Sequence, residues 1–95
     1  MKIDKSPRYI RTVKKILKSH TLSLAQIEEC ERLFENDYKH HSLRYHQIRC
    51  KKDKNRYSIT LPNTQYRILL SSFGDRAILV ALLNHKDYDM NNKDC

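Results

Sequence analysis

The sequence has 95 residues, of which 39% are hydrophobic, and a formal net charge of +8. A chain of this length supports one domain with one small core, over residues 1–95, and its hydrophobic content argues against a disordered polypeptide. No run approaches the roughly 18 apolar residues of a membrane span, and the basic N-terminus lacks the apolar segment of a signal peptide. Three well-separated cysteines without a Cys-x-x-Cys pair favour reduced thiols and a cytoplasmic protein.

The positive charge is concentrated in two parts of the chain. Residues 1–20 contain seven lysines and arginines and one acidic residue. Residues 39–67 contain eight lysines and arginines and one acidic residue. Residues 21–38 between them are acidic, with one arginine and five acids. Such an excess favours a polyanionic partner, most often nucleic acid. A generally basic surface that only maintains solubility is the alternative.

Two amphipathic helices are predicted in the first part of the chain. Residues 6–20 follow the helical period, with Ser6 as the N-cap and a proline at the first helical position. Residues 22–37 form the second helix, which begins with a capping box of Ser23 and Gln26. The connection is short, so we expect the two helices to pair as an antiparallel hairpin.

From Leu43 the hydrophobic period changes from helical to alternating, which predicts a sheet. The last strand is apolar on both faces and is therefore expected to be internal and covered. The predicted fold class is α+β, with the helical hairpin packed on a twisted, mostly antiparallel sheet of four or five strands. The predicted strands are 42–50, 56–62, 64–71 and 77–83, with residues 1–4 as an optional edge strand.

A basic cluster on three neighbouring strands and their turns is the largest candidate site. Guanidinium groups bind phosphates, and tyrosine rings interleaved with them can stack on unpaired bases. A lysine-protected sheet edge explains the turn at 51–55 equally well. It explains Arg67 poorly, because this arginine lies inside an apolar strand. The cluster comprises Arg44, Arg49, Lys51, Lys52, Lys54, Arg56 and Arg67, with Tyr45, Tyr57 and Tyr66 between them.

The histidines show no spacing typical of a zinc site, so we expect no metal and no cofactor. Three of them, His20, His40 and His41, are interpreted as helix-end and loop residues. His46 and His85 stand where a fixed site can hold a general acid or base, although a purely structural hydrogen bond remains open for His46.

The segment after the last strand places His85, Lys86 and Tyr88 where a meander would bring them toward the arginines. Arginine, histidine and tyrosine around one phosphate suffice for RNA cleavage by 2′-hydroxyl attack, without a metal. A frayed, solvated tail is the alternative interpretation of this segment. Since Leu82 and Leu83 close the apolar run and most of the core is complete before Asn84, we expect the tail to matter more for function than for folding.

Four segments, "ENDYKHHSLRYHQI", "NRYSITL", "TQYRILL" and "ALLNHKDYD", resemble the RelE/ParE superfamily of toxins from bacterial type II toxin–antitoxin systems. The likeness covers nearly the whole chain and ends in a His-x-x-Tyr motif. It implies a RelE-like fold and, as in ribosome-dependent members, an endonuclease that cuts mRNA in the ribosomal A site and is inhibited by a cognate acidic antitoxin. A ParE-like inhibitor of DNA gyrase and a non-catalytic, basic RNA-binding module are the alternatives.

The resemblance also implies roles for individual residues. Arg67 would stabilise the phosphate charge, His46 and His85 would transfer protons, and Tyr88 would stack on or orient a base. The residues expected to position RNA or the ribosome are Arg44, Arg49, Lys51, Lys52, Lys54, Arg56 and Lys86.

Overall fold

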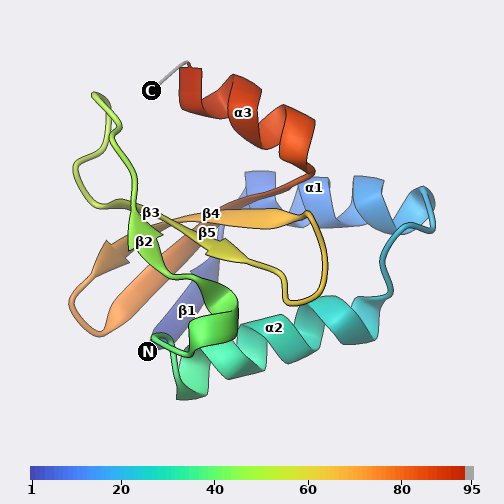
Figure 1. Ribbon diagram of the computed structural model, residues 1–95, viewed down its shortest axis with the longest axis horizontal. Helices are drawn as coiled ribbons and strands as arrows, with labels where there is room; N and C mark the ends of the chain where they lie inside the picture. The colour runs from blue at the N-terminus through green and yellow to red at the C-terminus, as the bar shows by residue number, and fades with distance from the viewer. Residues whose placement is uncertain (94–95) are drawn as a thin grey trace.

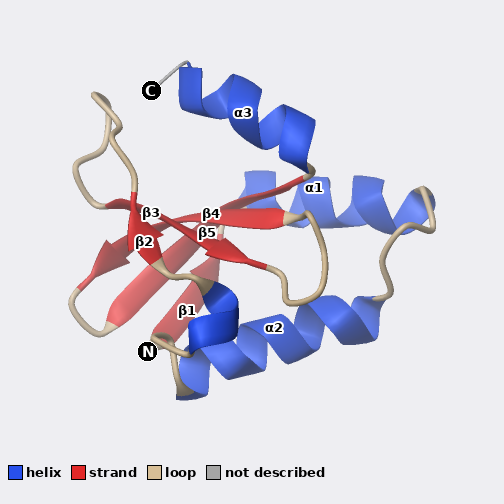
Figure 2. Cartoon of the chain, in the orientation of Figure 1, coloured by secondary structure: helices blue, strands red, loops and turns tan. Residues whose placement is uncertain are grey.

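The computed structural model describes residues 1–93 of the chain. In chain order the elements are β1 (Lys2–Lys5), α1 (Pro7–Lys18), α2 (Leu24–Asn36), the 3₁₀ turn η1 (His41–Leu43), β2 (His46–Gln47), β3 (Arg56–Thr60), β4 (Arg67–Phe73), β5 (Arg76–Leu83) and α3 (His85–Lys93). The chain thus forms two long helices, α1 and α2, and a C-terminal helix, α3. Figures 1 and 2 show these helices around a twisted sheet.

The sheet has five strands in the order β1-β5-β4-β3-β2. All neighbouring strands are antiparallel except β1, which pairs in parallel with β5. The N-terminal residues therefore form the edge strand that the sequence left optional, and β5 lies inside the sheet as expected. This architecture confirms the predicted α+β class with a mostly antiparallel sheet.

Both long helices begin at the side chains that the sequence indicates. The Ser6 hydroxyl accepts a hydrogen bond from the Tyr9 amide at 3.0 Å, and Ser23 and Gln26 form the full capping box. The two helices run antiparallel, as Figure 1 shows. Across their interface the Tyr9 hydroxyl donates to Glu31 Oε2 at 2.7 Å. The helical hairpin is thus confirmed.

The main core lies between this hairpin and one face of the sheet, which we call the helix face. Strand residues such as Ile59, Ile68 and Leu79 pack there against Tyr9 and Phe34. A smaller apolar cluster lies on the opposite face, which we call the outer face. It consists of Leu69, Ala81, Leu83 and Tyr88, with Ile48 and Val80 packed against it.

An irregularity in the β4–β5 ladder determines which side chains reach the outer face. The register passes from Leu70 opposite Leu79 to Leu69 opposite Ala81, so Val80 has no partner on β4. Such a bulge changes the direction in which the following side chains point. Leu83 consequently lies on the outer face, opposite Arg67, and leads the chain into α3 above the sheet in Figure 1.

The predicted long strand at 42–50 is wrong. The segment forms the turn η1, and only His46 and Gln47 pair with β3. His40 caps this turn, since its Nδ1 accepts from the Ser42 amide at 3.2 Å. Arg44 then takes a left-handed backbone conformation with a φ of 50°. Local side-chain-to-backbone hydrogen bonds of this kind compete with the hydrogen bonds of a strand ladder, and in this segment they stabilise the turn instead of a strand.

The sequence analysis predicted no helix after the last strand, and the structure differs from it here. Residues His85–Lys93 form the helix α3, and Tyr88 is 9% exposed against the outer face. The Asn84 side chain accepts from the Asp87 amide at 2.8 Å and so satisfies the start of this helix. Packing of one aromatic ring therefore orders a segment whose own helical pattern is weak.

Two expectations from composition can be compared with the described residues. No helix within them is long and apolar enough to cross a membrane. Cys30 is a free, buried thiol, whereas Cys50 is disulfide-bonded. The expectation of three reduced cysteines is therefore wrong for Cys50, and Cys95 lies outside the described residues.

Candidate nucleic-acid interface

The sheet register brings His46 and Arg67 to the same face. His46 lies opposite Ser58 on β3, and Ser58 lies opposite Leu69 on β4, which belongs to the outer-face cluster. Arg67 lies two residues before Leu69 on the same strand, so it shares that face. The backbones of β2 and β4 are two strand spacings apart, about 10 Å, and His46 is also offset from Arg67 by two residues along the strands, because the β3 partner of Arg67 is Thr60. The two side chains would therefore have to extend toward each other across β3 to contact one phosphate group.

Arg67 lines a surface cavity of about 670 Å³. Its side chain is half-buried, and Nη1 donates to the Tyr66 carbonyl oxygen at 3.3 Å. Arg44 lines the same cavity, so two guanidinium groups and several hydroxyl and amide donors surround the space. This chemistry suits an anion such as a phosphate. The lining residues are His41, Ser42, Arg44, Thr60, Pro62, Asn63, Thr64, Gln65 and Arg67.

His46 is exposed and has a defined ring orientation. Its Nδ1 lies 2.7 Å from the carbonyl oxygen of Arg44. A carbonyl oxygen can only accept, so Nδ1 must carry the proton of this bond. In the neutral ring Nε2 is then the unprotonated nitrogen and is available as a base. The hydrogen bond left open by the sequence exists, and it is compatible with proton transfer.

His41 belongs to the cavity but is absent from the residues that the sequence analysis selected. It lies in η1, it is exposed, and its ring stacks on that of His40 with 4.5 Å between the ring centroids. The sequence contained the pair of adjacent histidines but no periodic signal for a fixed position. The turn η1, which no periodic signal predicts, places His41 among the residues that line the Arg67 cavity.

His85 occupies the first position of α3, two residues after the cross-strand partner of Arg67. Its Nε2 lies 3.4 Å from Asp89 Oδ2, one helical turn further along, and both side chains are largely exposed. Lys86 is exposed beside it. The structure thus places His85 at the edge of the outer face, outside the residues that line the Arg67 cavity.

Tyr88 lies under α3 rather than on the open surface. Its ring packs against Leu69, Ala81 and Leu83, and the residue is 9% exposed. This burial favours a structural role, in which Tyr88 holds α3 on the sheet, over the predicted stacking on a base.

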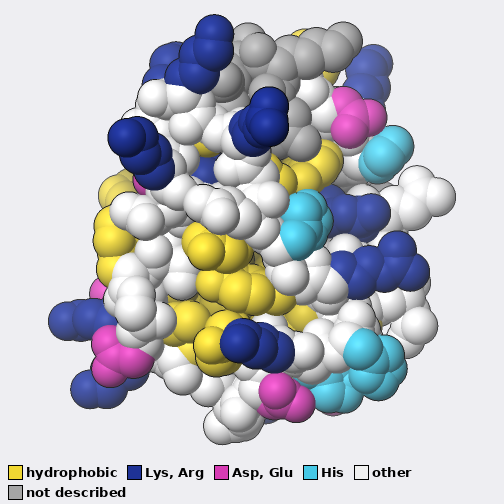
Figure 3. All heavy atoms as spheres, turned by 60° about the vertical axis from the view of Figure 1, so that its left-hand side comes forward, with side chains coloured by type: hydrophobic (Ala, Val, Ile, Leu, Met, Phe, Trp, Pro, Cys, Tyr) yellow, Lys and Arg dark blue, Asp and Glu magenta, His cyan; other side chains and the backbone are white. Residues whose placement is uncertain are grey.

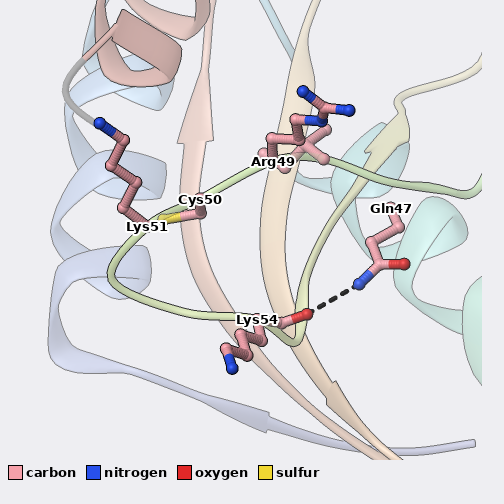
Figure 4. Close-up of a pocket in the computed structure, with 6 residues that line it drawn as sticks. Gln47, Arg49, Cys50, Lys51 and Lys54 are labelled. Atoms are coloured by element: carbon pink, nitrogen blue, oxygen red, sulfur yellow. Dashed lines mark hydrogen bonds between the residues drawn. The ribbon is translucent and has the colours of Figure 1, made fainter.

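The loop at residues 49–54, which we call the basic loop, joins β2 to β3 and carries most of the predicted phosphate-binding side chains. Arg49, Lys51, Lys52 and Lys54 are all exposed. Figure 4 shows several of these side chains around a second cavity, of about 650 Å³. The Gln47 side chain closes the base of the loop by donating to the Lys54 carbonyl oxygen at 2.8 Å.

Arg56 lies half-buried beside the basic loop. Its Nε is 3.5 Å from Asp53 Oδ2. Hydrogen bonds from the Ser71 hydroxyl and the Asn55 amide, together with Arg56, hold the pKa of Asp53 below its usual range. The Arg56 Nε is therefore buried beside the Asp53 carboxylate in an ion pair, in contrast to the exposed lysines of the loop.

The tyrosines that alternate with the basic residues in sequence lie elsewhere in the structure. Tyr45 and Tyr57 stack on each other with 4.7 Å between their ring centroids, and Tyr57 pairs with Leu70 on the helix face. The Tyr66 hydroxyl lies 2.7 Å from the Thr21 hydroxyl. These rings support the fold, and the interleaving expected from the sequence does not bring them to the outer face.

The surface carries the charge that the composition indicates. Figure 3 shows histidine side chains beside lysine and arginine side chains along one side of the molecule. Within residues 1–93, no group of three or more histidine, cysteine, aspartate and glutamate side chains is arranged to hold a metal ion.

No protein-family model matches the sequence, and no curated protein sequence is significantly similar to it. Solved structures do match the fold. The YafQ protein of Escherichia coli superposes with a TM-score of 0.74 at 11% identity, over 90% of this chain and 94% of that chain. A chain of the E. coli DinJ–YafQ toxin–antitoxin complex superposes on this chain with a TM-score of 0.73 at 14% identity, over 90% of this chain and 92% of that chain.

A third match is a copper-bound mutant toxin from Helicobacter pylori, with a TM-score of 0.70 at 14% identity. It covers 92% of this chain and 97% of that chain. The chain therefore has the fold of these toxins along nearly its whole length, which confirms the RelE-like fold expected from the sequence resemblance.

Proposed function

We propose that this protein is the toxin of a type II toxin–antitoxin system and that it cleaves translated mRNA in the ribosomal A site. The observation that carries the proposal is the cavity in which Arg67 and Arg44 meet His41, beside the oriented ring of His46. The fold shared with YafQ supports the same conclusion.

In the proposed reaction the two arginines bind the scissile phosphate and stabilise the charge of the phosphorane. His46 Nε2 removes the proton from the 2′-hydroxyl, whose oxygen forms a bond to phosphorus. The bond to the 5′ oxygen breaks, and a second acid, His85 or His41, protonates that leaving oxygen. The products are a 2′,3′-cyclic phosphate and a 5′-hydroxyl end, and the reaction requires no metal and no cofactor.

The exposed cations of the basic loop and Lys86 are proposed to hold the RNA backbone or the ribosome. Each phosphate that a lysine or arginine neutralises releases counterions, so this binding is expected to weaken steeply with salt. The cognate antitoxin is proposed to be acidic, because it must cover this positive surface.

Induced expression in bacteria with primer extension on a reporter mRNA tests the proposal. We expect growth arrest and cuts within the reading frame that disappear when the start codon of the reporter is removed. Cuts independent of translation would contradict ribosome dependence. Intact mRNA together with gyrase-dependent DNA breaks would support a ParE-like inhibitor, and intact mRNA and DNA would leave a non-catalytic RNA-binding module.

The partner can be tested with the neighbouring reading frame. Co-expression of a small acidic protein encoded beside this chain is expected to restore growth and to co-purify with it. A neighbour that neither binds nor protects would contradict the toxin–antitoxin assignment.

A further inference from the structure

We propose that Asp53 is a positioning residue that holds the basic loop in the conformation that binds the RNA backbone, so this carboxylate strengthens RNA binding. The inference rests on the proposed function and adds a residue that the sequence analysis did not select. Asp53 is the only acid among residues 39–67, and charge alone predicts that it weakens binding to a polyanion.

The contacts of Asp53 connect the loop with two strands. Its Oδ2 accepts a hydrogen bond from the Ser71 hydroxyl of β4 and lies 3.5 Å from Arg56 Nε at the start of β3. Its Oδ1 accepts from the Asn55 amide at 2.8 Å. One side chain therefore ties the tip of the loop, β3 and the buried Ser71 together.

A second tie lies directly beside this carboxylate. The Asn55 carbonyl oxygen accepts from the Ser72 amide at 2.9 Å, which attaches the end of the loop to β4. Within the loop, the Asp53 amide donates to the Cys50 carbonyl oxygen at 3.3 Å. The carboxylate thus stabilises a loop whose end already continues the pairing of β3 with β4.

This anchor adds to the other ties of the loop and opposes the charge repulsion between its lysines. Lys51, Lys52 and Lys54 are exposed and close in sequence, so their like charges favour an open and variable loop. Ordering a variable loop at the moment of binding costs affinity, whereas a loop ordered beforehand does not incur that cost. The carboxylate also pairs with Arg56, so within residues 49–56 the cations left to face RNA are the exposed ones of the loop.

A purely electrostatic role and a positioning role of Asp53 predict opposite changes in RNA affinity when the carboxylate is removed, so a binding measurement can distinguish them. We would measure binding of a short, labelled single-stranded RNA by fluorescence anisotropy at several salt concentrations. If Asp53 acts by charge alone, Asp53→Asn tightens binding. If it positions the loop, Asp53→Asn weakens binding by roughly three- to tenfold. The slope of log K against log salt concentration should then fall by the amount expected for the loss of about one or two phosphate contacts.

Two further variants separate the explanations. Ser71→Ala leaves the charge unchanged but removes the main hydrogen bond to the carboxylate, so it is expected to weaken binding in the same direction. Asp75→Asn removes one negative charge from the exposed β4–β5 turn and serves as the charge-matched control. It is expected to bind RNA as tightly as the wild type or slightly more tightly.

Melting temperatures of all variants show whether the fold is intact, and the salt dependence is a readout that general destabilisation does not move. Tighter or unchanged binding by Asp53→Asn, as in Asp75→Asn, would overturn the positioning role alone. A wild-type protein without affinity for RNA would overturn both this role and the proposed function.

Discussion

The imidazole of His46 is held by a 2.7 Å hydrogen bond from its Nδ1 to the carbonyl oxygen of Arg44. This bond assigns the proton to Nδ1 and leaves Nε2 as the nitrogen that can accept one. The same Arg44 lines the cavity of Arg67. The candidate base is thus positioned by the backbone of a residue whose side chain is proposed to bind the phosphate.

Replacement of His46 by glutamine should lower the rate of cleavage by about 10²–10⁴, because an amide does not accept the 2′ proton. We expect little change in melting temperature, since the ring is exposed. Single-turnover cleavage on mRNA-programmed ribosomes measures the effect. His20→Asn, at an exposed position of the turn after α1, is the matched control and should cleave at the wild-type rate. Equal rates in both variants would remove His46 from the mechanism.

Arg67→Ala should lower the cleavage rate by about 10²–10³, because one preorganised contact to the transition-state charge is lost. Arg67→Lys keeps the charge but loses the planar, bidentate geometry, so it should rescue only part of the rate. Rates are compared with Arg32→Ala, which removes a charge from the exposed side of α2. An Arg67→Ala protein that no longer melts cooperatively would show that the arginine serves the fold instead.

Tyr88→Ala should destabilise the protein by about 2–4 kcal/mol, because the ring fills the only apolar contact described between α3 and the outer face. Met90→Ala, two residues further along α3 and 57% exposed, should change stability by less than about 0.5 kcal/mol. Urea unfolding monitored by circular dichroism gives both values. Equal stability of the two variants would mean that α3 does not depend on this packing.

Cys30 should resist alkylation by iodoacetamide at neutral pH in the native protein. Burial, and then the nearby charge of Glu31, raises the pKa of its thiol to about 12. Because the folded-state pKa is raised, the associated stability is complete below the ordinary pKa of 9.0 and is lost as the pH rises toward about 12. Burial and the hydrogen bond to Glu31 raise the pKa of Tyr9 as well, so it adds to this loss above about pH 10.

Urea unfolding at a series of alkaline pH values measures this dependence. Cys30→Val should flatten the decline of stability most between about pH 9 and pH 10, where the contribution of Tyr9 is only beginning. Rapid modification of Cys30 under native conditions would contradict its burial.

The sequence by itself identified the elements that depend on local chemistry. The capping box at Ser23 and Gln26 begins α2 because a hydroxyl and an amide side chain satisfy the free amides of a helix end wherever that helix lies. The alternating segments around Ile59 and Ile68 form strands because their period exposes one apolar face. Arg67 was selected for a similar reason, since an arginine inside an apolar strand requires a polar destination.

Only the tertiary structure decided which of these residues meet. The sheet register places His46 and Arg67 on one face but directs Tyr57 to the other, and a period of two residues in each strand does not reveal how neighbouring strands align. The turn η1 brings His41 to the cavity, and Tyr88 folds α3 onto a face created by the bulge at Val80. Elements form from neighbours in the chain, whereas a site forms from contacts between distant segments, and those depend on how the whole core packs.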